Sequence, residues 1–315
     1  MELFTDPKTL FHSKRANIFY LEKCRVMVRA GRVVYMTHGK EGQSSFNIPA
    51  LNTTVVLLGI DTSITQSAVR MLALEGVLIG FSGSAGTPLF AGTSVEWLCP
   101  QNEYRPTDYL QRWLTCWFDE TKRTEMARKL QRFRLHYIER VWSEDKALQQ
   151  AGFYLDDVLT EKALKDFAQK IAVCENATQL LALDTSLTKQ LYTIAATCTK
   201  RQDFVRDEDS LDDVNLFLNQ GNYLAYGLAA TTLWVLGIPH GFPLMHTSTK
   251  RGALVFDVAD LIKEALILPL AFICAKAQMS ELAFRQHCLE AFTRHNALDF
   301  MFETLKKISG EGEEL

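Results

Sequence analysis

The chain has 315 residues, of which 47% are hydrophobic and 23% charged, and a formal net charge of −3. These values predict a folded protein with room for two domains and exclude a disordered chain. A net charge near zero means that only local clusters of basic residues can indicate nucleic-acid binding. The seven cysteines form no CxxC pair and no leader segment is evident, which predicts a reduced, cytoplasmic protein. No apolar run predicts a membrane span.

The first hundred residues have the character of a β-rich domain. Short runs rich in β-branched and aromatic residues predict strands at 16–22, 24–30, 31–37, 53–59 and 76–82. Between the last two runs, residues 63–75 have helical spacing, and Ser63 is the expected N-cap.

The pattern changes near Pro100. From there on, helical periodicity predicts helices at 107–118, 120–149, 156–173, 177–197, 211–236, 256–277, 279–293 and 296–308. The sequence therefore predicts an α+β fold, with an N-terminal β-rich domain (1–100) and a larger all-α domain (101–315).

One predicted helix carries carboxylates in an otherwise apolar run. Residues 254–275 contain only four charged side chains, those of Asp257, Asp260, Lys263 and Glu264. The three acids are spaced i, i+3, i+7 and share one face of a helix. Buried carboxylates need a cation. A divalent metal and a salt bridge to Lys or Arg both satisfy this spacing.

Two further residues are candidates for the same site. Asp184 falls in an apolar helical stripe with Leu180 and Leu187, although an N-cap at a helix kink is an equally good interpretation. His246 lies in a Gly/Pro-rich segment, where a lone histidine is more often a packing residue than a ligand. Together, three carboxylates and one imidazole suit Mg²⁺ or Mn²⁺ better than zinc.

Four sequence blocks resemble the CRISPR-associated endonuclease/spacer integrase family, most closely its type I-F branch. They are HSKRANIFYLEKCRVMVRAGRVVY, NEYRPTDYLQRWLTCWFDETKR, GNYLAYGLAATTLWVLGIPHG and MHTSTKRGALVFDVADLIKEALILP. The resemblance implies a β domain followed by a helical domain, and a site for Mg²⁺ or Mn²⁺ made of a glutamate, a histidine and an aspartate, with a second aspartate three residues on. These positions fall on Asp184, His246, Asp257 and Asp260.

Asp184 departs from the family pattern, which has glutamate there. Aspartate keeps the charge but is one methylene shorter, so its reach falls by roughly 1.5 Å. The resemblance implies metal-dependent attack of a protospacer 3′-hydroxyl on a phosphodiester of the CRISPR array. A catalytically weakened, DNA-binding structural subunit of the adaptation complex is the alternative that this substitution leaves open.

Basic residues predict where DNA binds. The run 122–140 holds seven Lys/Arg against two Glu, although such a run is more often a solvated helix face. The candidates are Lys14, Arg15, Lys122, Arg123, Arg132, Lys200, Arg201, Lys250 and Arg251. Tyr192, Asn222 and Tyr226 are weaker candidates for orienting the substrate, with helix packing favoured for both tyrosines.

The resemblance also implies partners: double-stranded and branched DNA, a homodimer formed through the β domain, and a second adaptation subunit fused to the interference helicase–nuclease. Two other classes remain open from spacing alone. A hydrolase of small phosphoesters would lack basic surface around the site. A metal-free helical scaffold would pair Asp257 with an arginine.

Overall fold

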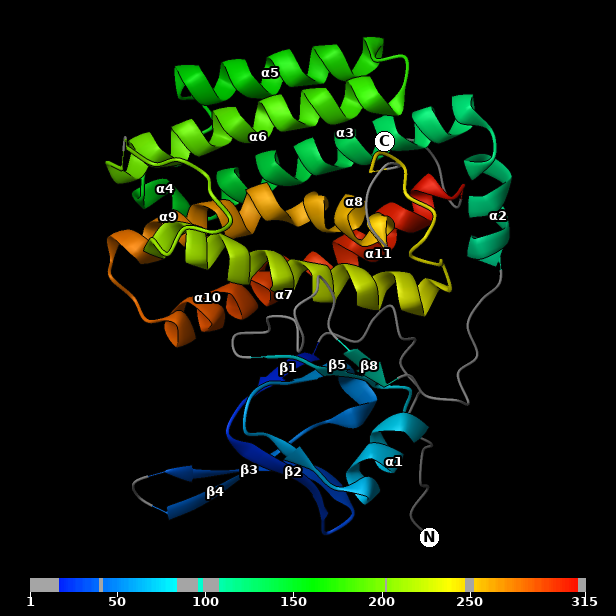
Figure 1. Ribbon diagram of the computed structural model, residues 1–315, viewed down its shortest axis with the longest axis vertical. Helices are drawn as coiled ribbons and strands as arrows, with labels where there is room; N and C mark the ends of the chain where they lie inside the picture. Colours follow the sequence, from blue (N-terminus) through cyan, green and yellow to red (C-terminus); the bar gives the residue numbers. More distant parts are fainter. Residues whose placement is uncertain are drawn as a thin grey trace, which may run out of the picture. The chain divides into compact units, whose positions relative to one another are not determined.

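A computed structural model describes residues 17–39, 42–83, 96–98, 108–201, 203–246 and 252–310, which belong to two compact units, Met1–Tyr104 and Arg105–Leu315 (Figure 1). The first unit is built on β-sheets and the second on helices. The predicted α+β class is therefore confirmed. Within the described ranges, every helix is too short or too polar to cross a lipid bilayer.

The first unit holds two four-stranded sheets. One has the order β1 (Asn17–Leu21), β5 (Thr53–Leu58), β7 (Leu78–Phe81), β8 (Glu96–Leu98), and the other β4 (Gly42–Asn47), β3 (Arg32–Gly39), β2 (Cys24–Arg29), β6 (Ser63–Ile64). Strand β5 pairs in parallel with both β1 and β7, and all six of its residues are buried. A central parallel strand is covered on both faces, which explains its unbroken apolar sequence.

Helix α1 (Gln66–Leu74) covers this core with Ala68 and Leu72. The prediction that Ser63 caps it is wrong, because Ser63 belongs to β6 and the Thr65 hydroxyl accepts the Ala68 N–H at 3.3 Å. Strands β4 and β8 were not predicted, since neither has an apolar alternation strong enough to mark it.

The second unit contains the eight predicted helices, two of them divided. They are α2 (Asp108–Trp117), α3 (Glu120–Glu144), α4 (Lys146–Gln150), α5 (Val158–Val173), α6 (Ala177–Thr199), α7 (Asp213–Leu236), α8 (Ala253–Ile262), α9 (Leu268–Lys276), α10 (Glu281–Arg294) and α11 (Ala297–Ile308). Asp145 separates α3 from α4, because its carboxylate accepts the N–H groups of Ala147 and Leu148 and so starts a new helix.

The other division lies within the apolar run. A π-helical turn, Lys263–Ile267, joins α8 to α9. Helix α8 lies between α3 and α7 and packs against both, and the π-turn also contacts these two helices (Figure 1). Every residue of α8 from Asp257 to Ile262 is buried. The carboxylates of this helix are therefore held in the interior of the helical unit.

Candidate functional site

His246 and Asp257 form the best-defined pair of the site. The imidazole Nδ1 of His246 lies 2.6 Å from Oδ1 of Asp257, whose side chain is fully buried. Burial alone would lower the pKa of His246, but the hydrogen bond that its Nδ1 makes to the Asp257 carboxylate and the charges of Asp260 and Asp257 outweigh burial and raise that pKa. Because Nδ1 is engaged by Asp257, any bond of this imidazole to a metal would be made by Nε2.

Asp257 is fully occupied by hydrogen-bond donors. Its Oδ2 accepts the N–H groups of Leu244 and Met245 at 2.6 and 3.2 Å, and its Oδ1 accepts the His246 N–H at 3.3 Å as well as Nδ1. A carboxylate offers about four lone-pair positions, and these four donors use them. Asp257 therefore orients His246 and anchors the segment that carries it.

Asp260 lies one turn further along α8 and is paired with the first residue of the π-turn. The Lys263 ammonium is its ion-pair partner, and both side chains are largely buried. Burial would raise the pKa of Asp260, but Lys263, Arg134 and His246 together lower it. Asp260 is thus ionised, and His246 lies near enough to influence its charge.

Asp184 belongs to a second polar cluster, centred on Arg134 of α3. The Arg134 guanidinium pairs with Asp184 and, at 3.0 Å, with Glu264. All three side chains are buried, and Thr188 lies one turn beyond Asp184 with its hydroxyl 3.1 Å from Arg134 Nη2. Asp184 stands in the middle of the continuous helix α6, so the alternative that it caps a kinked helix is wrong.

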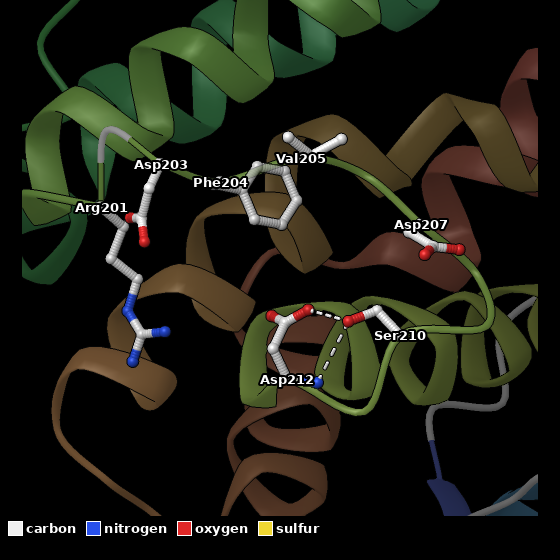
Figure 2. A pocket seen from close by; sticks show the side chains of 7 residues that line it. All are labelled: Arg201, Asp203, Phe204, Val205, Asp207, Ser210 and Asp212. Carbon is white, nitrogen blue, oxygen red and sulfur yellow. Dashed lines mark hydrogen bonds between the residues drawn. The ribbon is translucent and has the colours of Figure 1, made fainter.

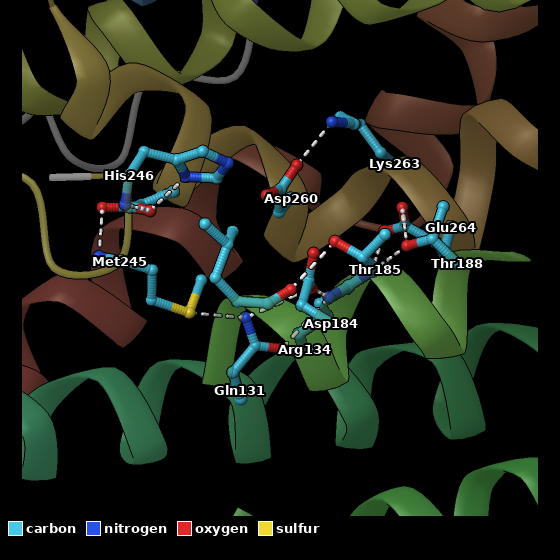
Figure 3. Close-up of polar contacts among 12 residues, drawn as sticks. Gln131, Arg134, Asp184, Thr185, Thr188, Met245, His246, Asp260, Lys263 and Glu264 are labelled. Carbon is cyan, nitrogen blue, oxygen red and sulfur yellow. Dashed lines mark hydrogen bonds and ion pairs between the residues drawn. The ribbon is translucent and has the colours of Figure 1, made fainter. Parts of the chain in front are cut away.

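Gln131 joins the two halves of the site (Figure 3). Its Nε2 lies 3.4 Å from Asp184 Oδ1 and 3.2 Å from the sulfur of Met245, the residue before His246. These contacts link Asp184 of α6 to the 238–246 segment, which carries His246 and is bound by Asp257 of α8, while Asp260 is related to this network through the charges of Arg134 and His246. Figure 3 shows the Asp184 and Asp260 carboxylates directed to Arg134 and Lys263.

The donor types of this network suit a hard divalent cation: carboxylate oxygens from Asp184 and Asp260 and an imidazole nitrogen from His246. In the part of the chain that the structure describes, no three His, Cys, Asp or Glu side chains are grouped closely enough to hold a metal ion. Two of the carboxylates are paired with resident cations, Asp184 with Arg134 and Asp260 with Lys263. The alternative of a metal-free helical scaffold predicted that an arginine pairs with Asp257. In the structure the arginine, Arg134, pairs with Asp184.

The three candidates for orienting the substrate lie on α6 and α7. Tyr226 packs edge-on against Phe256, and the Lys263 ammonium lies 5.7 Å from its ring centre. Tyr192 contacts Phe204, and burial raises the pKa of both tyrosines, so both are neutral hydroxyls at pH 7. Asn222 is half-buried on α7. Tyr226 thus has a packing role and is also close to the Asp260–Lys263 pair.

Lys14, Arg15, Lys250 and Arg251 lie outside the described residues. Lys122 and Lys200 are exposed, and Lys200 ends α6 in a left-handed conformation. Arg132 is exposed and lies 3.5 Å from Glu125. Two others have structural contacts: Arg123 stacks over Trp117 at 5.4 Å, and Arg201 donates to the Ala275 carbonyl at 3.1 Å.

The structure adds Arg134 and Arg206 to the charged residues that matter. Arg134 has a signal in the sequence, because it falls on the apolar stripe of α3 with Leu130, Tyr137 and Val141. A single arginine on such a stripe predicts a buried carboxylate partner. Arg206 lies in an irregular segment, where no periodicity could single it out.

Arg206 is held by neutral partners. Its guanidinium donates to the side-chain oxygens of Asn215 and Asn219 at 2.8 and 2.7 Å, while Glu208 lies 3.9 Å away and is 86% exposed. Its positive charge is therefore only weakly compensated. It lines a hollow of about 440 Å³ with Lys189 and Tyr192.

A second hollow, of about 310 Å³, has the opposite character (Figure 2). Its acidic lining residues are Asp203, Asp207 and Asp212, and Ser210 donates to Asp212 at 2.6 Å. Phe204 and Val205 line both hollows. The segment thus presents an acidic side and a basic side, and only the basic side is suited to a phosphate.

The comparisons with known proteins agree with this architecture. A family model for the CRISPR associated protein Cas1 matches residues 19–298. The CRISPR-associated endonuclease Cas1 of Pseudomonas aeruginosa (strain UCBPP-PA14) is 51% identical over 308 residues, covering 96% of this chain and 95% of the relative. That of Pectobacterium atrosepticum is 45% identical over 315 residues, covering 98% and 96%.

Two solved structures share the fold at lower identity. A TtCas1–DNA complex has a TM-score of 0.66 at 23% identity, covering 95% of this chain and 93% of its own. A casposase bound to an integration product has a TM-score of 0.70 at 12% identity, covering 95% and 92%. The family model and the two relatives place this protein in the class of CRISPR-associated endonucleases. The chain belongs to the Cas1 family, as the sequence predicted.

Proposed function

We propose that this protein is a divalent-metal-dependent DNA endonuclease and integrase of CRISPR adaptation. The observation that supports this most strongly is the buried Asp257, which fixes His246 through Nδ1 close to the ionised Asp260. A carboxylate that orients a histidine in this way is typical of metal sites. Family membership and the DNA in the TtCas1 and casposase structures support a nucleic-acid substrate.

In this proposal Asp184, His246 and Asp260 hold Mg²⁺ or Mn²⁺, and Asp257 positions His246. The cation, when bound, would activate the attacking hydroxyl and neutralise charge on the phosphodiester. Lys263 and Arg134 neutralise Asp260 and Asp184 in the structure. A bound cation would take over that role, and the two basic side chains would then be available to neutralise phosphate charge.

The proposed reaction inserts protospacer DNA into the CRISPR array by 3′-hydroxyl attack. The proposed assembly is a homodimer with a second adaptation subunit fused to the interference helicase–nuclease. Support for these finer points comes from the sequence resemblance and from 51% identity to the Pseudomonas protein.

The basic hollow is the proposed path of a DNA strand leaving the site. Tyr192 follows Asp184 by eight residues on α6, about 12 Å along the helix axis. Lys189, Tyr192 and Arg206 line the hollow there. Arg206 is preorganised by two neutral amides, and its carboxylate partner Glu208 is exposed and 3.9 Å away, so pairing with a phosphate displaces only a weak ion pair.

Replacing Arg206 with Ala should weaken DNA binding. It should also reduce the slope of log affinity against log salt concentration by about one, which corresponds to one lost phosphate contact. The check is titration of branched DNA at several salt concentrations. Arg112→Ala is the matched control, because Arg112 is an exposed arginine of α2 that lines neither hollow. An equal salt dependence in wild type and Arg206→Ala would remove the hollow from the DNA path.

A structural, catalytically weakened subunit is the second candidate, and the pairing of Asp184 with Arg134 favours it. Half-site integration with purified protein and its partner separates the two. We expect wild type to show Mn²⁺-stimulated cleavage and integration. Asp184→Glu should raise the rates of both by about tenfold or less, since the longer side chain restores the reach of the family residue. DNA binding by wild type with no Mn²⁺-stimulated cleavage, restored by Asp184→Glu, would instead identify the structural subunit.

A further inference from the structure

Pro269 interrupts the backbone hydrogen bonding of a buried helical segment. It is the second residue of α9, directly after the π-turn. Proline has no N–H to donate, and its ring crowds the carbonyl of the residue four positions earlier, which is Ala265. Ala265 is fully buried, where a carbonyl without a donor is costly.

Trp142 supplies the missing donor from another helix. Its indole Nε1 lies 3.2 Å from the Ala265 carbonyl oxygen. The Trp142 side chain is fully buried on α3, and its ring packs edge-on against Phe153 at 5.2 Å. The indole N–H thus supplies a donor to the carbonyl that the N–H of residue 269 would serve in a regular α-helix.

The π-turn determines where two charged side chains point. In this turn the Leu268 N–H bonds to the Lys263 carbonyl, so one extra residue is accommodated. Lys263 and Glu264 are its first two residues, and they pair with Asp260 and Arg134. Loss of the extra residue would rotate one side of the segment by about 100° relative to the other, and would break at least one of these pairs.

We propose that Trp142 is a positioning residue for the site: by donating to Ala265 it holds the π-turn that aims Lys263 at Asp260 and Glu264 at Arg134. Arg134 precedes Trp142 by eight residues on α3, so one helix braces adjacent residues of the turn at two points. The part of this proposal that concerns Lys263 and the metal rests on the proposed function. The hydrogen bond from the Trp142 indole to the Ala265 carbonyl is independent of the proposed function.

A double-mutant cycle tests this hydrogen bond in metal-free protein. Trp142→Phe should raise the unfolding equilibrium constant by about 30-fold in wild type, but by only about threefold in Pro269→Ala, where the new N–H serves Ala265. Val141→Ala is the matched control, since Val141 is fully buried on the same helix; its effect should be the same in both backgrounds. Equal effects of Trp142→Phe in both backgrounds would overturn the proposal.

Mn²⁺ binding tests the positioning role separately. We expect at least about tenfold tighter Mn²⁺ binding in Trp142→Phe, because Lys263 then competes less for Asp260, and a change of less than about twofold in Val141→Ala. Equal changes in the two variants would make Trp142 a packing residue only. If wild type binds no Mn²⁺, the proposed function fails, while the unfolding cycle still decides whether the Trp142 indole serves the Ala265 carbonyl.

Discussion

Replacing Asp260 with Asn is expected to lower Mn²⁺-dependent DNA cleavage by about a thousandfold or more. The reason is that Asp260 is a buried, ionised carboxylate near His246 and is proposed to hold the cation. Cleavage of labelled branched DNA over a range of Mn²⁺ concentrations measures this loss. High Mn²⁺ should not restore full activity, because a ligand is missing rather than weakened.

Two controls separate lost chemistry from lost structure. Asp260→Asn leaves the buried Lys263 without its partner, so the double variant Asp260→Asn/Lys263→Met should recover stability but not cleavage. Glu290→Gln removes an exposed carboxylate from α10 and should retain activity. Cleavage by Asp260→Asn within about threefold of wild type would exclude Asp260 from the site.

Replacing Arg134 with Met should be among the most destabilising single changes, lowering the free energy of unfolding by about 3–5 kcal/mol. Arg134 is 1% exposed and pairs with two buried carboxylates, which the variant leaves without a cation. Urea unfolding measures the loss. Adding Glu264→Gln should recover part of it, because only Asp184 would then remain unpaired.

Mn²⁺ gives this variant a distinctive response. With Arg134 absent, Asp184 has no resident competitor for the metal, so added Mn²⁺ should stabilise Arg134→Met more than wild type. Arg128→Met on the same helix is the comparison, since that side chain is half-buried and donates to the Cys174 carbonyl. A loss below about 1 kcal/mol in Arg134→Met would show that the network does not need its guanidinium.

Periodicity predicted the helical unit well because its helices bury continuous apolar stripes. It could not predict the break at Asp145, whose capping role depends on its backbone geometry and not on the apolar pattern. The short strands β4 and β8 were missed for a similar reason. Each depends on a neighbouring strand, β3 or β7, for its pairing.

The sequence indicated which of the site residues lie near one another better than it indicated their contacts. Spacing placed Asp257, Asp260 and Glu264 on one face of a helix. Their partners differ, because Asp257 binds a loop, Asp260 pairs with Lys263 and Glu264 pairs with Arg134. The role of Asp257 depends on three N–H groups that converge from residues 244–246, and no sequence pattern encodes that convergence. Pro269 was the one visible sign that the helix could not be regular.

The most direct test of the account is the dissociation constant for Mn²⁺, measured by calorimetry on wild type, His246→Ala and Asp257→Asn. We expect one site per chain in wild type, binding at least about a hundredfold weaker without the imidazole, and about 10–100-fold weaker when only its orienting carboxylate is changed. The same affinity in His246→Ala as in wild type would contradict a metal held by His246 and its neighbouring carboxylates.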